Sequence, residues 1–156
     1  MSTSIDYRNR TYDLAAFQGL RASGSTYTPQ ALTTTPVMGT ICTGTAKLAQ
    51  RFLLEFLTPR GSMPFRPTRG CSFVPALLRG ELTTEVAVFT AFAYAMAELA
   101  NNMRIDASAD DPLDEQFADA ELIGLAMTNG KVTLSINLTT RAGSSRPVIL
   151  PIPILP

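Results

Sequence analysis

The chain has 156 residues, 46% of them hydrophobic, which is enough for one domain with a core that needs no disulfide support. Thirteen basic and thirteen acidic residues give zero net charge, and the absence of histidine excludes Ser–His and Cys–His nucleophiles, histidine bases and histidine-bound zinc. No apolar run approaches the roughly 20 residues that cross a bilayer, and no signal region follows the first charges, so we expect no membrane partner and no secretion by that route.

The charges are unevenly divided along the chain. Residues 1–70 hold eight basic and three acidic residues, whereas residues 71–156 hold five basic and ten acidic ones. Nucleic-acid binding needs a concentrated basic face, and here the basic residues are spread out, so we expect no nucleic-acid partner. An assembly with basic contacts on one side and acidic contacts on another fits this split, and so does a solvated surface.

The first 42 residues show no sustained hydrophobic period and contain two breakers, Pro29 and Pro36. A structureless run of this length is unusual within a compact domain. We therefore interpret residues 1–42 as an extended N-terminal arm, with a short helical piece around residues 12–20, and residues 43–156 as the folded domain. The arm cannot bury enough apolar surface to offset its ordering entropy, so we expect it to be mobile in the free subunit and ordered in an assembly.

Two helices and a stiff loop are predicted next. A helix over residues 43–57, capped by Thr43 or Thr45, has a stripe of apolar residues at helical spacing: Leu48, Phe52, Leu53, Phe56 and Leu57. A loop with three prolines and two glycines covers residues 58–70. A short helix over residues 72–79, opened by Ser72, points Phe73 and Leu77 inward.

A longer helix is predicted from Thr83 or Thr84 to Asn102. Its apolar residues recur at spacings of three and four, and we assign the core-facing stripe to Val86, Phe89, Ala93, Met96, Ala100 and Met103.

The segment 106–119 is acidic, with Asp110 beside Asp111. The alternating ligands, central glycine and terminal glutamate of a calcium-binding EF-hand are absent, so we interpret the segment as a solvated loop. Cys42 and Cys71 are too few and too far apart for a metal cluster, and we interpret them as free thiols. We expect no metal and no cofactor.

Residues 120–140 predict a β-hairpin. Apolar and polar residues alternate on both sides of Asn129 and Gly130, which suit a two-residue type I′ turn. The implied register places Met127 opposite Val132, Leu125 opposite Leu134 and Ile123 opposite Ile136, with all three apolar pairs on one face.

The final segment, RPVILPIPILP at residues 146–156, is apolar and rich in proline. Pro147, Pro151 and Pro153 all have odd numbers, so they remove N–H donors from one edge of a strand and leave the other edge able to pair. We interpret it as an edge strand, with a polyproline-like tail as the alternative. The expected fold class is α+β: three helices packed on an antiparallel sheet of about three strands, with the N-terminal arm.

Three stretches together resemble the baseplate wedge subunits of contractile phage tails and type VI secretion baseplates, a family often labelled lysozyme-like. The first is the helix from KLAQR at 47–51 to the LTPRG sequence at 57–61, and the second is RPTRG at 66–70. The third is Arg104 and Ile105 after the long helix, where the family usually has Glu-Pro-Arg and an aliphatic residue. Ser62 and Met63 depart from a usual Glu-Arg. The resemblance covers about residues 44–153.

The resemblance implies a structural role. Family members attach to the wedge core proteins near the tail tube or hub, and present a small sheet to which arms of the tail sheath protein add strands. The expected location is the virion tail baseplate, assembled in the host cytoplasm. The residues expected to bind partners are Arg66, Arg104, Ile105, Glu121, Ile123, Leu125 and Met127. We expect sheath strands to join along residues 121–128, with residues 131–140 as the accepting edge if the hairpin has the other order.

Other functions are the alternatives to this sheath-initiator role. One is another tail structural role, such as a tube-end or neck adaptor. The other is a peptidoglycan-cleaving enzyme using a carboxylate pair. Glu81 and Glu85, which we place one turn apart on a helix, are better interpreted as surface residues near a helix N-terminus, so we expect no enzyme.

Overall fold

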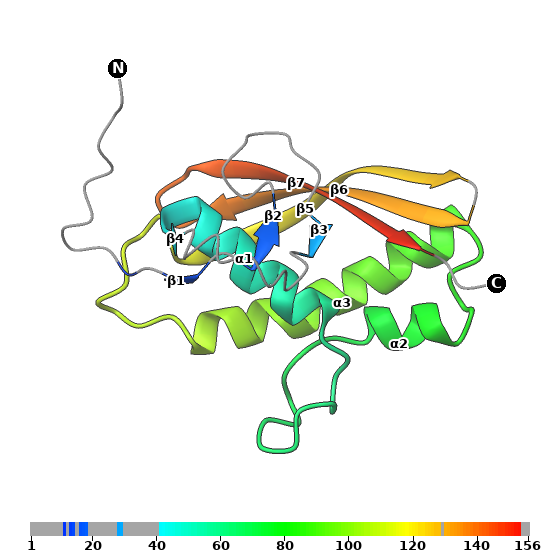
Figure 1. Cartoon of the computed structure of the whole chain (residues 1–156), viewed down its shortest axis with the longest axis horizontal. Coiled ribbons are helices and arrows are strands. Elements are labelled where there is room, and N and C mark those ends of the chain that lie inside the picture. The colour runs from blue at the N-terminus through cyan, green and yellow to red at the C-terminus, as the bar shows by residue number, and fades with distance from the viewer. Residues whose placement is uncertain are drawn as a thin grey trace, which may run out of the picture.

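A computed structural model of the chain describes residues 11, 13–14, 16–18, 28–29, 41–128 and 130–153. After four two-residue strands, β1 (Asp13–Leu14), β2 (Phe17–Gln18), β3 (Thr28–Pro29) and β4 (Ile41–Cys42), come three helices, α1 (Gly44–Leu57), α2 (Phe73–Leu78) and α3 (Glu85–Ile105). Three longer strands complete the chain: β5 (Phe117–Thr128), β6 (Lys131–Thr140) and β7 (Ser145–Pro153). The predicted α+β class, with three helices and a three-stranded antiparallel sheet, is confirmed (Figure 1).

The sheet has the order β5-β6-β7, so β6 is central and the other two strands are its edges. The hairpin register pairs Met127 with Val132 and Leu125 with Leu134, as predicted, and Gly130 has a φ of +71°. Asn129 lies outside the described residues. β7 pairs with β6 over its whole length, so the prediction of a proline-bearing edge strand is confirmed and the polyproline alternative is excluded for residues 145–153.

The predicted pairing of Ile123 with Ile136 is wrong. Leu122 is opposite Ile136, and Gly124 is opposite Ser135, so Ile123 is an extra residue in a β-bulge. The bulge changes which residues face inward, because side chains alternate along a strand and one inserted residue reverses the parity. Ile123 is 58% exposed as a result.

The helices cover one face of the sheet, with α1 against β6 and β7 and α3 against β5 (Figure 1). The inward apolar residues of β6 are 0–1% exposed. They meet an aromatic cluster in which Phe52 stacks with Phe56 and Phe117, and Phe56 also packs against Phe73 and Phe92. The predicted inward positions of α1 are confirmed, with Leu57 partly buried, as are those of α2.

The expected core stripe of α3 is only half right. Met103 is buried and Met96 and Ala100 are partly buried, but Val86, Phe89 and Ala93 are exposed. The core face is a neighbouring stripe of Val88, Phe92, Ala95 and Leu99. Both stripes are apolar and have helical spacing, so periodicity alone could not choose between them. The helix also continues to Ile105, three residues beyond the expected end.

The acidic segment before β5 is not entirely a solvated loop, because Glu115 is 1% exposed. Its carboxylate accepts the N–H of Gly44 at 3.1 Å and forms an ion pair of 3.1 Å with Lys47, and it also accepts the hydroxyl of Thr11. Thr43 is at the N-cap position of α1 but makes no side-chain capping bond. A carboxylate from a distant segment thus caps α1, where the helix dipole favours negative charge.

The described part of the N-terminal region is extended and lies on α1. β1 pairs with β4 and β2 pairs with β3. The N–H of Ala16 donates to Gln50 Oε1 at 2.6 Å, and Gln50 Nε2 donates to the carbonyl of Leu14 at 2.8 Å. The short helix expected around residues 12–20 is therefore wrong for its described residues. The boundary at residue 42 and the mobility of residues 1–42 stay predictions, since most of that segment lies outside the described residues.

Candidate functional site

The outer edge of β5 is the candidate binding site. Because prolines cannot donate, β7 must direct the N–H groups of Val148, Leu150 and Ile152 to β6. Because backbone groups alternate in direction along a strand, the N–H and C=O groups of Lys131, Thr133 and the following odd-numbered residues of β6 point toward β5. On β5, the N–H groups that point outward belong to Ala120, Leu122, Leu125 and Met127, which are opposite even-numbered residues of β6.

One hydrogen bond agrees with this assignment. The Ala120 N–H donates to the Asp119 carboxylate at 2.9 Å, as expected of a donor at an open edge. A charged residue at such an edge also discourages unspecific pairing.

The β7 edge is closed in a different way. Pro147, Pro151 and Pro153 are opposite Asn137, Thr133 and Lys131, at positions where the backbone points away from β6. The donors left on this edge of β7 are the N–H groups of Ser145 and Ile149. A strand could not form a regular ladder here, so β5 is the edge of this sheet that can accept one.

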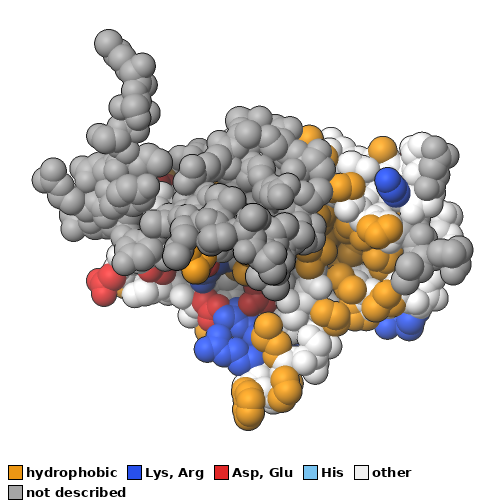
Figure 2. Space-filling model, viewed as in Figure 1, with side chains coloured by type: hydrophobic (Ala, Val, Ile, Leu, Met, Phe, Trp, Pro, Cys, Tyr) orange, Lys and Arg blue, Asp and Glu red, His pale blue; other side chains and the backbone are white. Residues whose placement is uncertain are grey.

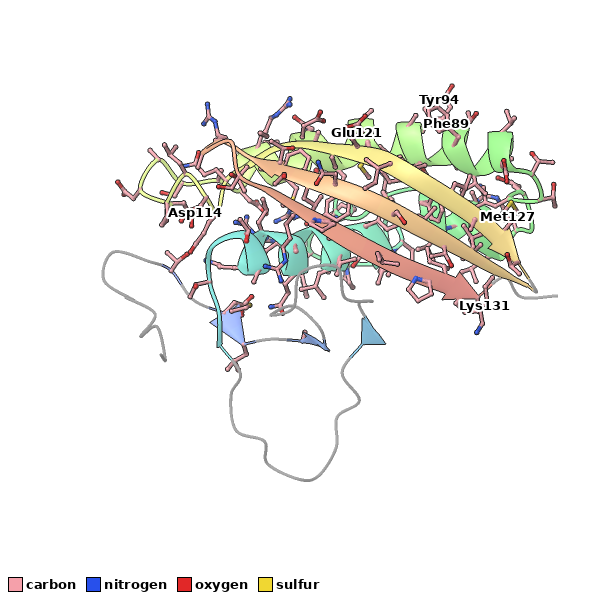
Figure 3. The ribbon with its side chains drawn as sticks, turned by 90° about the horizontal axis from the view of Figure 1, so that it is seen from above. Phe89, Tyr94, Asp114, Glu121, Met127 and Lys131 are labelled. Carbon is pink, nitrogen blue, oxygen red and sulfur yellow. The ribbon has the colours of Figure 1, made fainter. Side chains whose placement is uncertain are left out.

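Four of the predicted partner-binding residues lie on β5 (Figure 3). Glu121 and Ile123 are exposed, while Leu125 and Met127 are partly buried on the side that faces the helices. The structure thus brings these four residues to one edge. Their side chains divide between the two faces of the sheet, which the bulge at Ile123 makes possible.

The first exposed turns of α3 form a ledge beside this edge, made of Val86, Phe89 and Ala93. Val86 is 75% exposed and Phe89 is 58% exposed. Figure 3 shows Phe89 on the side of α3 that extends beyond the outer edge of β5. Sequence analysis placed these residues in the core. Their apolar spacing is typical of a buried surface, but all three are exposed in this chain.

Arg104 and Ile105 are in the last turn of α3, and both are exposed. Arg104 lines an open hollow of about 410 Å³ with Arg141 and with Phe117 and Ala118, the first residues of β5. Among the described residues Arg104 has no ion-pair partner. The structure therefore places Arg104 near the beginning of the candidate edge, with its guanidinium available to an acidic group.

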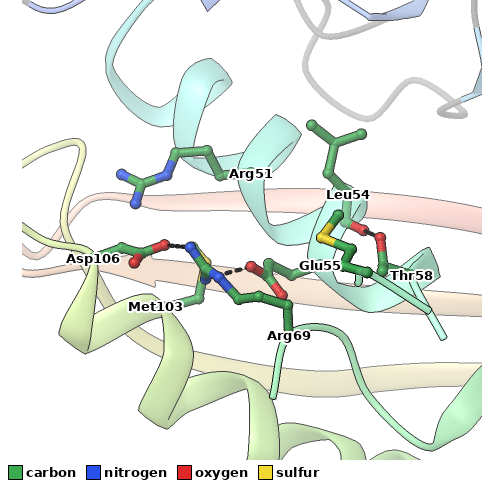
Figure 4. A pocket seen from close by; sticks show the side chains of 8 residues that line it. Arg51, Leu54, Glu55, Thr58, Arg69, Met103 and Asp106 are labelled. Carbon is green, nitrogen blue, oxygen red and sulfur yellow. Dashed lines mark hydrogen bonds and ion pairs between the residues drawn. The ribbon is translucent and has the colours of Figure 1, made fainter. Parts of the chain in front are cut away.

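Arg66 lies elsewhere, in the loop of residues 58–71. The base of this loop is braced by main-chain bonds from Cys71 N–H to the Thr58 carbonyl (3.0 Å) and from Arg60 N–H to the Cys71 carbonyl (3.1 Å). Arg69 forms ion pairs with Glu55 and Asp106 (Figure 4). The loop is therefore a fixed projection.

Glu98 of α3 adds a second brace to the same loop. Its carboxylate accepts Ser72 N–H at 2.8 Å, the Ser72 hydroxyl at 2.9 Å and Arg60 at 2.6 Å. Burial by itself would raise the pKa of Glu98, but these donors outweigh it and hold the pKa below its ordinary value. Cys71, buried beneath the loop, has its pKa raised to about 11, chiefly by burial. Its thiol is therefore a poor nucleophile.

The tip of the loop carries an exposed aromatic residue that sequence analysis missed. Phe65 is 98% exposed and Met63 is partly exposed. Figure 2 shows hydrophobic side chains gathered at this tip, beside charged ones at its base. A phenylalanine between two prolines, Pro64 and Pro67, was the available signal, but an exposed position cannot be told from a buried one by such spacing.

Within the described residues, no group of three or more His, Cys, Asp or Glu side chains could hold a metal ion, and no helix is long and apolar enough to cross a membrane. The expectation that Glu81 and Glu85 lie one turn apart on a helix is wrong, because α3 begins at Glu85 and Glu81 precedes it. Glu81 instead forms an ion pair of 2.6 Å with Arg79.

Comparisons of the chain with protein-family models, with curated proteins and with solved structures found no match.

Proposed function

We propose that the chain is a non-catalytic structural subunit of a contractile tail baseplate, and that its β5 edge accepts a strand from the tail sheath protein. One observation carries this proposal: the sheet has one 12-residue edge strand with outward donors, while prolines close the opposite edge. A long open edge is an aggregation hazard unless a partner uses it. Strand addition supplies affinity through main-chain hydrogen bonds and specificity through alternate side chains.

The resemblance of residues 44–153 to baseplate wedge subunits supports the choice of assembly. In that role, Arg104 and Ile105 at the end of α3 and Arg66 on the projecting loop contact the wedge core proteins or the tube and hub. The three residues are exposed, as a contact surface requires. The proposed location is the virion tail baseplate. In an activity gel the purified protein should leave peptidoglycan intact, because the proposal assigns it no catalysis.

Proline substitution separates a main-chain contact from a side-chain contact. Leu125→Pro removes an outward N–H of β5, and Leu125→Ala removes the same side chain but keeps the donor. Ile149→Pro is the matched control on the other edge, where prolines already interrupt the donors. Each variant is expressed in a producing strain that lacks the wild-type coding sequence, after circular dichroism has verified its fold.

We expect Leu125→Pro to yield baseplates without sheath in electron micrographs, and Leu125→Ala and Ile149→Pro to yield sheathed tails. Full-length sheaths with folded Leu125→Pro would contradict the proposed docking edge. Normal tails in the strain that lacks the chain altogether would contradict the assignment to the baseplate.

A further inference from the structure

The apolar layer beneath the sheet is incomplete at its β5 side. The inward apolar residues of β6 are 0–1% exposed, whereas Leu122, Leu125 and Met127 of β5 are only partly buried. Beside them, Val86 and Phe89 of α3 are 75% and 58% exposed. Most surface apolar residues occur singly, but here they continue the core outward from the last strand.

Helical geometry places the ledge on the β5 side of α3. Phe89 and Ala93 are seven residues before Met96 and Ala100, about two helical turns, so each pair shares one side of the helix. Met96 and Ala100, like Leu122 and Leu125 of β5, are partly buried and pack against the hydrophobic core. The ledge therefore continues the contact surface between α3 and β5 toward the space beside the open edge, in agreement with Figure 3.

Tyr94 lies on a different flank of the same helix. It is five residues from Phe89, roughly 140° around the axis. It lines a groove with Ala76 and Leu82 on the side of α2. Tyr94 is also exposed, so it is the control for an exposed aromatic residue of α3 that lines the groove beside α2 and is not part of the ledge.

The opposite face of β5 is acidic. The strand contains Asp119 and Glu121, both exposed, and no basic residue. Opposite charges on directly facing strand positions are favourable and like charges are unfavourable. A second copy of β5 would bring two more carboxylates and no cation, so a different segment with basic residues fits this edge better.

From these observations we propose that the ledge of Val86, Phe89 and Ala93 is the floor beneath the strand that β5 accepts. The ligand is then an extended segment with apolar residues at alternate positions, which face α3, and with Lys or Arg between them, which face Asp119 and Glu121. This inference rests on the proposed function, and it specifies the chemistry of the segment that the edge selects.

Synthetic peptides test this specificity on the full chain. The first peptide alternates Val and Lys over nine residues, the second has the same composition with the Val and Lys in separate blocks, and the third alternates Val and Glu. Binding of fluorescent peptides is measured by anisotropy with wild type, Phe89→Ala, Tyr94→Ala, Glu121→Lys and Leu125→Pro. Sedimentation of the chain alone reports self-association.

We expect the alternating Val–Lys peptide to bind wild type at least tenfold more tightly than the other two peptides. Phe89→Ala should weaken it about tenfold and Tyr94→Ala should leave it unchanged, while Glu121→Lys should shift the preference toward the Val–Glu peptide. Equal binding of the block peptide would mean simple charge attraction and would overturn the inference. Self-association of the chain that Phe89→Ala abolishes would also overturn it, by making a second copy the occupant.

The two proposals fail in different ways. If Leu125→Pro abolishes peptide binding and sheath growth but Phe89→Ala binds like wild type, the floor is wrong and the docking edge stands. If Leu125→Pro grows normal sheath, the proposed function is wrong whatever the peptides do.

Discussion

Replacing Gly70 by alanine tests whether the loop of residues 58–71 is a fixed platform. Gly70 has a φ of +80°, and a Cβ there would lie 2.2 Å from the carbonyl oxygen of Thr58. The left-handed conformation costs a residue other than glycine about 1–2 kcal/mol. Relief of the clash must also move Thr58 away from Cys71, whose N–H it accepts at 3.0 Å.

The expected loss follows from these contacts. The Thr58–Cys71 and Arg60–Cys71 main-chain bonds form a single bridge, so we expect both to weaken, at about 0.5–1.5 kcal/mol each. With the conformational cost, Gly70→Ala should lower the free energy of unfolding by about 2–5 kcal/mol. Urea denaturation followed by circular dichroism measures this as a lower midpoint at an unchanged slope.

Gly61→Ala is the matched control. Gly61 has a similar φ of +83° in the same loop, but a Cβ there would meet nothing within 4 Å. Gly61→Ala should therefore lower the free energy of unfolding only by the cost of the left-handed conformation, about 1–2 kcal/mol. Equal losses for the two variants would refute the reasoning, because they would show that the close approach to Thr58 contributes nothing.

Three further predictions concern buried or braced groups. Glu115→Ala should destabilise the fold by about 3–5 kcal/mol in the same assay, because it leaves Lys47 and the start of α1 without their carboxylate; a loss below 1 kcal/mol would contradict that role. Since Glu98 has a lowered pKa in the folded chain, its contribution to the free energy of unfolding is present above its ordinary pKa of 4.5 and is lost as the pH falls below that value. Glu98→Gln should therefore reduce the loss of stability on acidification, measured as the free energy of unfolding against pH. An unchanged dependence on pH below 4.5 would contradict the role of Glu98 as a brace. Cys71, with its pKa raised to about 11, should react with a thiol reagent at about pH 8 only after denaturation, and rapid labelling of the native chain would show that the loop opens.

The local elements followed from the sequence because their signals are short-range. The apolar stripe of α1, the breakers after it and the turn at Gly130 each act within a few residues, and the structure agrees with all three. The odd-numbered prolines of β7 likewise identified an edge strand, since the missing N–H is a property of the residue itself.

The errors arose where a distant segment decided the outcome. The two apolar stripes of α3 are equivalent as patterns, and packing against β5 and α1 selected the one that includes Val88 and Phe92. The cap of α1 is Glu115, 71 residues from Gly44, a pairing that no local rule can indicate. The bulge at Ile123 is similar, because the local alternation of apolar and polar residues does not indicate an inserted residue there.

The sequence by itself therefore determined the α+β class, the hairpin and the closed edge of β7. Helix periods, turn residues and missing N–H donors depend only on residues that are close together in the sequence. Only the tertiary structure decided that β6 is central and β5 is the open edge, and that Phe89 lies on an exposed ledge beside it. Strand order and burial depend on which elements that are distant in the sequence contact each other, and the packing of the whole chain decides those contacts.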